Sequence, residues 1–337
     1  MSRLFPLFLL WMVLACSESV RPVFRGQTMG TAYSVILSDT TLSQTDAQNL
    51  KSQIDKCLLD VNASMSTYIP ESEIARFNRW HKTEPFQVSA NFLTVLKQAR
   101  QIYDETGGAY DVTVAPLVNL WGFGSTGRRN NPPAEKDIRE RLKTIGMDKL
   151  RINDTFITKQ HPALQLDFSS IAKGFGVDRV AGLLREKGYR NFLVEIGGEV
   201  VTSGLREGRP WRVGIDKPDT TLGMGHELQM VLQLSNRAVA TSGDYRNFFV
   251  THDTLYSHTI DPVSGHPIIN HMASATVIAP TCTRADAMAT ALMVLGVEKG
   301  LPWVENQKGI EAMLIIRRPG QPFEIHTTSG FSRYQAP

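Results

Sequence analysis

Apolar residues recur at helical spacing in two stretches of the N-terminal third of the chain. The apolar positions are Leu50, Ile54, Leu58, Val61 and Met65 in the first stretch, and Phe92, Leu96, Ala99 and Tyr103, behind a capping Ser89, in the second. Each pattern predicts an amphipathic helix, because residues three and four apart share one helix face. Two more helices are predicted over residues 171–187 and 284–295.

Short runs rich in β-branched and aromatic residues are interspersed with these helices. They predict strands at 31–37, 192–196, 211–215, 229–234, 245–250, 274–279, 311–316 and 323–327. Because strands and helices mix without a strict βαβ rhythm, we predict an α+β fold with mixed, largely antiparallel sheets and packed helices. The sequence shows no internal repeat and no long linker, so residues 23–337 are expected to form one folding unit.

The composition is ordinary for a soluble globular protein. Of the 337 residues, 42% are hydrophobic and 20% are charged, which excludes a disordered chain, a collagen-like chain and a polytopic membrane protein. The 36 basic residues barely outnumber the 33 acidic ones, and the net charge is +3. This balance provides no electrostatic case for a nucleic-acid partner, so none is expected.

The N-terminal residues have the form of an export signal. Arg3 precedes an apolar run over residues 4–14. That run is too short to span a bilayer core of about 30 Å, so it predicts a cleaved signal peptide at 1–15 rather than an anchoring helix.

Residues 13–16, with the sequence VLAC, resemble the bacterial lipobox. They predict acylation of Cys16 and a lipidated tether over 16–22; an ordinary signal cleaved near residue 15 is the alternative, and under either the mature chain is exported. The remaining Cys57 and Cys282 could pair in an oxidising compartment, but buried free thiols are the favoured interpretation.

One glycine-rich motif matches a dinucleotide-binding pattern but lacks the structural context that such a site needs. Residues 122–127 match G-x-G-x-x-G, but a dinucleotide site requires a preceding strand and a following helix. This segment instead runs into the sequence RRNNPP at 128–133, which cannot begin a helix promptly. The P-loop, zinc-protease and nucleophile-elbow signatures are absent from the sequence.

The first of four candidate stretches is residues 106–116, TGGAYDVTVAP. Gly107 and Gly108 would let the backbone approach a ligand closely, and Asp111 follows at an expected strand start. A turn with a capping aspartate would produce the same pattern, so both interpretations stay open.

The second stretch is residues 166–174, LDFSSIAKG. Asp167, Ser169 and Ser170 precede a predicted helix, whose free N–H groups and dipole favour an anionic phosphate. Lys173 on the first turn would add a positive charge. A helix cap without a ligand is the alternative.

The third stretch contains His258, which the sequence places in a strand that ends at an Asp-Pro turn, residues 261–262. This histidine could hold a phosphate or carry a proton, although a structural histidine would look the same. In the fourth stretch Asp286 and Thr290 are four residues apart, so on a helix their oxygens share one face. Such a pair suits Mg²⁺; a solvated aspartate beside a packing face is the alternative.

Together these stretches resemble the ApbE family, the FAD:protein FMN transferases, over nearly the whole mature chain. The matching motifs are MGT at 29–31, STY at 66–68, GGAYD at 107–111, PLVNLWGFG at 116–124, DFSS at 167–170, GG at 197–198, SG at 242–243, YRN at 245–247, SH at 257–258, IDP at 260–262 and ADA at 285–287. Each motif is short, but their order and spacing make the set specific.

The resemblance implies a T-fold-like single unit of two lobes, anchored by lipid in the bacterial cell envelope and facing the periplasm. Members of the family bind FAD with Mg²⁺, move its FMN half onto a threonine or serine hydroxyl of a target protein through a phosphoester bond, and release AMP. The implied acceptors are exported flavin-carrying subunits of redox pumps.

By position, the resemblance also assigns site residues. FAD contacts are implied for Met29, Tyr68, Ala109, Tyr110, Asp111, Asp167, Lys173 and Ile260, and metal contacts for Ser170, Asp286 and Thr290. Ala289 stands where some members have a second metal aspartate.

The target hydroxyl must lose a proton, and His258 is the candidate base, with Asp111 or Asp286 as further candidates. Two other functions stay open: an Mg²⁺-dependent FAD hydrolase that produces FMN and AMP, and a non-enzymatic FAD-binding lipoprotein. Tyr68 in the STY motif resembles the transferase type, and the Asp286–Thr290 pair argues against a carrier because storage needs no cleaving metal.

Overall fold

The computed structural model describes residues 22–125, 127, 131–218, 227–244, 248–251, 254–318 and 320–337. The predicted signal peptide, Cys16 and the tether up to residue 21 lie outside the described residues, and so does the YRN motif at 245–247.

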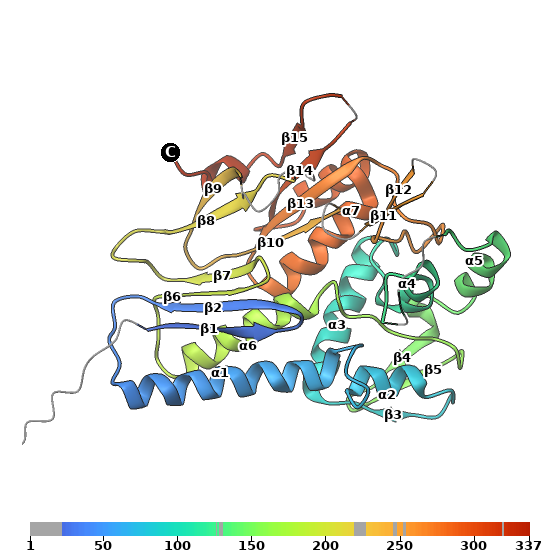
Figure 1. Cartoon of the computed structure of the whole chain (residues 1–337), viewed down its shortest axis with the longest axis horizontal. Helices are drawn as coiled ribbons and strands as arrows, with labels where there is room; N and C mark the ends of the chain where they lie inside the picture. The colour runs from blue at the N-terminus through green and yellow to red at the C-terminus, as the bar shows by residue number, and fades with distance from the viewer. Residues whose placement is uncertain are drawn as a thin grey trace, which may run out of the picture.

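An eight-stranded antiparallel sheet forms the centre of the fold (Figure 1). Its strands, in spatial order, are β1 (Val23–Thr28), β2 (Thr31–Leu37), β6 (Phe192–Ile196), β7 (Glu199–Ser203), β10 (Ala238–Gly243), β13 (Met272–Ala279), β14 (Glu311–Ile316) and β15 (Glu324–Thr327). Each neighbouring pair is antiparallel, with a bulge between Met272 and Ser274 where β13 meets β14.

Both faces of the central strands are covered. On one face lie α6 (Ala172–Glu186) and α7 (Cys282–Glu305), and α1 (Gln44–Met65) packs outside α6. On the other face, the hairpin of β8 (Trp211–Asp216) and β9 (Leu228–Leu234) and the 3₁₀ turn η3 (Phe331–Tyr334) close a second apolar core. As a result every residue of β13 and β14 is buried, whereas β2 nearer the edge keeps an alternating pattern.

A smaller lobe packs beside the large sheet (Figure 1). It contains a three-stranded sheet in the order β3 (Phe86–Gln87), β5 (Phe156–Lys159), β4 (Leu150–Ile152), and a hairpin of β11 (Phe248–Thr251) and β12 (Thr254–Ser257). Its helices are the long α3 (Ala90–Glu105) and the shorter α2 (Glu73–Arg79), α4 (Ala115–Trp121) and α5 (Glu135–Leu142), with the 3₁₀ turns η1 (Val112–Val114) and η2 (Met147–Lys149). One apolar cluster continues from α2 and α3 through α7 to β13 and β14. The two lobes therefore share a core.

The predicted α+β class with largely antiparallel sheets is confirmed. The helix expected at 284–295 is longer: it begins at Cys282 and, after a kink at Gly296 (φ 68°), continues to Glu305. α7 is the single described helix long and apolar enough to cross a membrane, but half of its most apolar window is buried, as in a core helix. The strand expected at 245–250 is described only as Phe248–Thr251.

Two local predictions need correction. Asp111 does not begin a strand: its carboxylate accepts the backbone N–H of Thr113 (2.7 Å) and caps the 3₁₀ turn η1, so the capping alternative is the right one for its local structure. His258 follows strand β12 instead of lying in it. Cys57 and Cys282 are both free, the first half-buried and the second buried, which matches the favoured interpretation.

Candidate functional site

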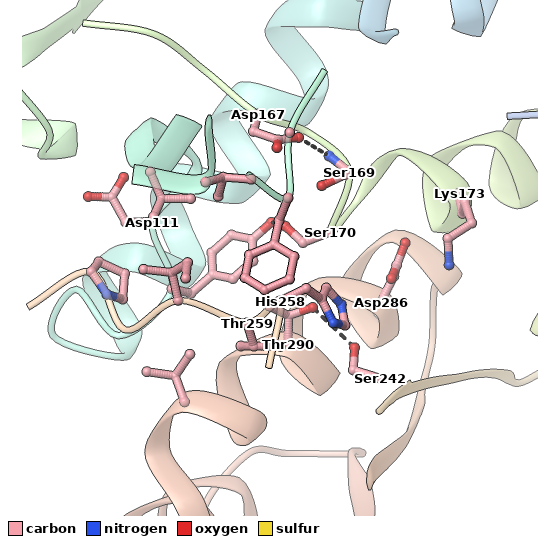
Figure 2. A pocket seen from close by; sticks show the side chains of 18 of the residues that line it. Asp111, Asp167, Ser169, Ser170, Lys173, Ser242, His258, Thr259, Asp286 and Thr290 are labelled. Carbon is pink, nitrogen blue, oxygen red and sulfur yellow. Dashed lines mark hydrogen bonds between the residues drawn. The ribbon is translucent and has the colours of Figure 1, made fainter. Parts of the chain in front are cut away.

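A cavity of about 350 Å³ lies where the two lobes meet. Its lining includes nearly all of the residues singled out from the sequence: Tyr68, Ala109, Tyr110, Asp111, Asp167, Ser170, Lys173, His258, Ile260, Asp286 and Thr290. Figure 2 shows labelled side chains converging from α6, from α7, from the segment before α6 and from the loop after β12. Gly174 and Asp286, 112 positions apart in the chain, are thus neighbours here because α6 and α7 pack against each other.

A second cavity of about 570 Å³ adjoins the first. Met29, the one predicted contact missing from the first cavity's lining, lies here at the tip of the β1–β2 hairpin. Met29 and Gly30 form its two-residue turn with positive φ angles of 50° and 73°, which directs the tip toward α1 and α6. The two cavities share lining residues, namely Thr67, Tyr68, Asp167, Ser169 and Lys173.

Asp286 and Thr290 lie one turn apart on α7 and both face the first cavity, as their spacing predicted. The Gly174 N–H donates to Asp286 Oδ2 (2.9 Å), and the hydroxyls of Thr290 and Ser242 are 3.1 Å apart. Burial raises the pKa of the Asp286 carboxyl, although Lys173 and the Gly174 N–H oppose the shift. Two oxygen donors are therefore presented to the same space.

Gly174 makes this contact possible. A Cβ at this position would lie 2.4 Å from the carbonyl oxygen of Cys282 and 2.8 Å from the Cβ of Asp286. Only glycine lets the backbone of α6 approach α7 closely enough for its N–H to reach the Asp286 carboxylate. Asp178, one turn further along α6, accepts the backbone N–H groups of Cys282 (2.9 Å) and Thr283 (2.8 Å), which caps the start of α7.

The segment before α6 contributes polar groups, as predicted. Asp167 Oδ1 accepts the Ser169 N–H (2.8 Å), and the Ser170 hydroxyl donates to the Tyr110 hydroxyl (3.1 Å). No side chain caps α6 at Ile171; the Ala172 N–H donates to the Phe168 carbonyl (2.8 Å) and the Gly174 N–H to Asp286. Burial raises the pKa of the Tyr110 hydroxyl far above its ordinary value, which keeps it a neutral hydrogen-bonding group.

Asp111 and His258 occupy different parts of the cavity wall. Figure 2 shows His258 toward Ser242, Asp286 and Thr290, and Asp111 on the opposite side of the site. Burial raises the pKa of Asp111 to about 6, while its bonds from Thr113 oppose the shift. The geometry therefore favours His258 over Asp111 as the group near the oxygen donors.

The donor set suits a hard cation that takes few protein ligands. Among the described residues no group of three or more histidine, cysteine, aspartate or glutamate side chains could hold a metal ion. Asp286, Thr290 and Ser170 offer one carboxylate and two hydroxyls at the cavity. Mg²⁺ commonly binds through one or two carboxylates and keeps waters or substrate phosphates as its other ligands. Ala289 is buried in the apolar core and lines neither cavity.

Sequence reasoning missed Glu199. It is 2% exposed, lines the first cavity and forms an ion pair with Lys173. Burial and the nearby Asp286 raise the pKa of Glu199. Burial alone would lower the pKa of Lys173, but Asp286 and Glu199 outweigh it and raise that pKa. The signal that could have found Glu199 is its place directly after the glycine pair at 197–198.

Comparison with known proteins places the chain in a family. Residues 29–314 match the ApbE family. The chain is 40% identical over 328 residues to a FAD:protein FMN transferase of Vibrio cholerae, covering 96% of this chain and 94% of that protein, and 40% identical over 327 residues to one of Haemophilus influenzae, covering 95% and 93%.

Solved structures agree with the sequence matches. The flavin transferase ApbE from Vibrio cholerae superposes with a TM-score of 0.82 at 40% identity, covering 94% of this chain and 99% of that one. The apo flavinyl transferase ApbE from Pseudomonas stutzeri superposes with a TM-score of 0.83 at 36% identity, covering 96% and 98%. With a family match over most of its length and relatives of this similarity, the chain belongs to the ApbE family.

Proposed function

We propose that this protein transfers the FMN half of FAD to a threonine or serine hydroxyl of an acceptor protein, with Mg²⁺ bound, through a phosphoester bond and with release of AMP. The observation that carries the proposal is the convergence of Asp286, Thr290 and Ser170 with His258 and Lys173 on one cavity. The names of the similar proteins, FAD:protein FMN transferases, support the same reaction.

The two adjoining cavities suit a ligand with two large halves joined by a diphosphate. Both volumes are within the range of about 300–1,000 Å³ that is typical of ligand sites. We assign the diphosphate to the residues shared by both cavities, where Lys173 and the start of α6 supply positive potential. Contacts to the rest of FAD are assigned to Met29, Tyr68, Ala109, Tyr110, Asp111, Asp167 and Ile260.

Mg²⁺ fits the oxygen donors of the site. We assign it to the Asp286 carboxylate with the Thr290 and Ser170 hydroxyls, because all three are hard oxygen ligands. A single carboxylate is enough, since Mg²⁺ usually takes its remaining ligands from water and substrate phosphates. When bound, Mg²⁺ supplies Lewis-acid stabilisation for the charge on the diphosphate oxygens.

The chain's own residues then have separate tasks in one displacement. The acceptor hydroxyl oxygen forms a bond to the FMN phosphorus, the bond from that phosphorus to the bridging oxygen breaks, and AMP leaves with the bridging oxygen. We assign to His258 the removal of the hydroxyl proton, since it faces the oxygen donors, and to Lys173 the stabilisation of phosphate charge. Positioning and electrostatics supply most of the catalysis in such transfers.

The test combines the purified full-length chain with FAD, Mg²⁺ and a flavoprotein domain that carries an acceptor threonine. Acceptor mass and AMP release are measured together for the unaltered chain, for Asp286→Ala and, as a control, for Asp154→Ala, whose side chain is fully exposed in a loop. We expect the acceptor to gain one FMN per AMP released, with loss of both in Asp286→Ala alone. AMP and free FMN with an unmodified acceptor would support the hydrolase, and bound FAD without AMP would support a carrier.

We also propose that the protein acts at the periplasmic side of the cell envelope, held by a lipid on Cys16, where exported flavin-carrying subunits of redox pumps would be its acceptors. The support is the lipobox-like sequence at 13–16. Fractionation of cells that express the full chain should find it in the membrane, and Cys16→Ser should release it. A Cys16→Ser chain that stayed in the membrane fraction would refute the lipid anchor.

A further inference from the structure

A tight turn places Glu199 in the wall of the first cavity. Ile196 of β6 pairs with Glu199 of β7, so Gly197 and Gly198 are the whole connection between the two strands. Their φ angles are 59° and 99°, which favour glycine, and the turn fixes the register that pairs Glu199 with Ile196. The glycine pair thus brings an acidic residue to a cavity that we assign to an anionic ligand.

Glu199 is unusual because its carboxylate is only half satisfied. Its side chain is 3% exposed; Oε1 accepts from the Lys173 ammonium, and Oε2 is buried without a hydrogen-bond partner in the described part of the protein. Burying a carboxylate in this way is costly. A negative charge beside a diphosphate would also weaken binding if it acted directly on the ligand.

We propose that Glu199 is a positioning residue that holds the Lys173 ammonium at the junction of the two cavities, where it meets the FAD diphosphate. A lysine side chain has a long, flexible stem, and orienting it on ligand binding costs conformational entropy. The ion pair with Glu199 orients the ammonium before the ligand arrives. Lys173 keeps 31% of its side chain exposed and lines both cavities, so the same ammonium can contact Glu199 and a phosphate oxygen.

This inference rests on the proposed function, since it takes the diphosphate of FAD as the ligand. Its test measures equilibrium binding of FAD to the purified full-length chain by the change in flavin fluorescence, with and without Mg²⁺. The variants are Glu199→Gln, Lys173→Met and the double variant. Glutamine keeps the shape of the side chain but removes the charge that orients the ammonium.

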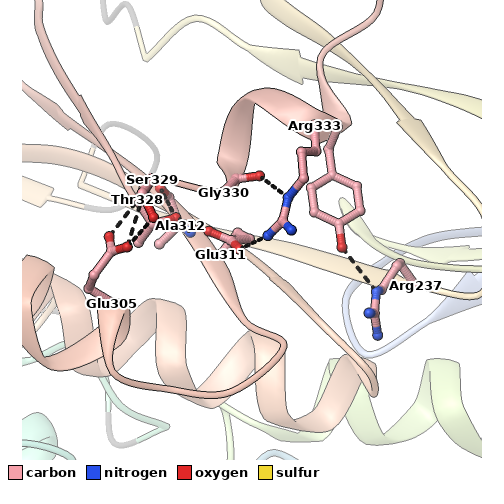
Figure 3. Close-up of polar contacts among 9 residues, drawn as sticks. Arg237, Glu305, Glu311, Ala312, Thr328, Ser329, Gly330 and Arg333 are labelled. Atoms are coloured by element: carbon pink, nitrogen blue, oxygen red, sulfur yellow. Dashed lines mark hydrogen bonds and ion pairs between the residues drawn. The ribbon is translucent and has the colours of Figure 1, made fainter.

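A matched control is available at the far end of the sheet. Glu311 is also a buried strand glutamate with a basic partner: it pairs with Arg333 (2.7 Å) and accepts from Thr328, as Figure 3 shows. It lines neither cavity. Glu311→Gln therefore repeats the chemical change without touching the site, and its FAD affinity should equal that of the unaltered chain.

We expect Glu199→Gln to weaken FAD binding about tenfold, the size expected for an oriented charge-assisted hydrogen bond, with and without Mg²⁺. In the Lys173→Met background the same change should cause no further loss, because its effect passes through the ammonium. Additive losses would overturn the inference, as would unaltered affinity in Glu199→Gln or an effect confined to Mg²⁺-containing buffer. An unaltered chain that bound no FAD would instead overturn the proposed function.

Discussion

Asp111 offers a test of whether the cavity wall stores unfavourable electrostatic energy. The residue is 7% exposed, and burial raises the pKa of its carboxyl from the ordinary 3.8 to about 6. At pH 7.5 the carboxylate is charged in both the folded and the unfolded chain, but only the folded chain bears the desolvation cost. The difference between the two pKa values corresponds to about 3 kcal/mol of folding free energy.

The substitution Asp111→Asn should therefore stabilise the protein. Asparagine keeps an oxygen that can accept from the Thr113 N–H and hydroxyl, both 2.7 Å from Asp111 Oδ1, so the turn survives while the charge disappears. Because the folded pKa is raised, the cost is fully present above pH 6 and fades as pH falls toward 3.8. The gain should be about 3 kcal/mol at pH 7.5 and roughly half of that at pH 5.

Urea unfolding of the FAD-free protein at the two pH values measures this gain, since bound ligand would itself add stability. Asp154→Asn, at a fully exposed position, is the control and should change little at either pH. A gain of equal size at pH 5 and pH 7.5, or a loss at both, would refute the electrostatic reasoning. FAD affinity should fall in Asp111→Asn, as expected where a residue is retained for function at the expense of stability.

Two further changes test packing. Lys159→Met removes an ammonium that has no hydrogen-bond partner among the described residues and lies 4.4 Å from the Phe77 ring, on a residue that is 1% exposed. Because burial lowers the lysine pKa to about 8, we expect the free energy of unfolding to rise by up to about 3 kcal/mol at pH 7, with a gain that declines as pH rises toward 10.5. An undiminished gain at pH 9.5 would contradict this. Gly174→Ala forces a Cβ against the Cys282 carbonyl, so it should lower the free energy of unfolding by an overpacking cost of about 1–3 kcal/mol, and it should also lower the melting temperature and the FAD affinity. Gly182→Ala on the same helix meets open space, so equal effects of the two substitutions would refute the close-approach argument.

Amphipathic surface elements could be predicted from the sequence because a single buried face leaves its period in the residue pattern. The helix inferred from Leu50 to Met65 is α1, and the strand expected at 31–37 is β2 with the same bounds. The strands β7 and β10 were not predicted. β7 is buried at every position but has the sequence EVVTS, so it shows neither the alternation of a half-buried strand nor a long apolar run like that of β14, EAMLII, which is also fully buried and was predicted.

The candidate site, too, could be predicted from the sequence only in part. Residue types and spacing on one element were enough to pair Asp286 with Thr290 and to place Lys173 on the first turn of a helix. They were not enough to find Glu199, because an acidic residue at a strand start is ordinary until the sheet buries it beside Lys173.

The sequence by itself determined the amphipathic elements and marked Asp167, Ser170, Lys173, Asp286 and Thr290 as candidates for binding a diphosphate or a hard cation, since these depend on local period and residue chemistry. Tertiary structure alone decided which of those residues meet, which carboxylates are desolvated, and that Asp111 and His258 lie on opposite sides of the site. The physical reason is that burial and electrostatic coupling depend on contacts between segments far apart in the chain. Gly174 against α7 and Glu199 beside Lys173 are two such contacts, and no local pattern records them.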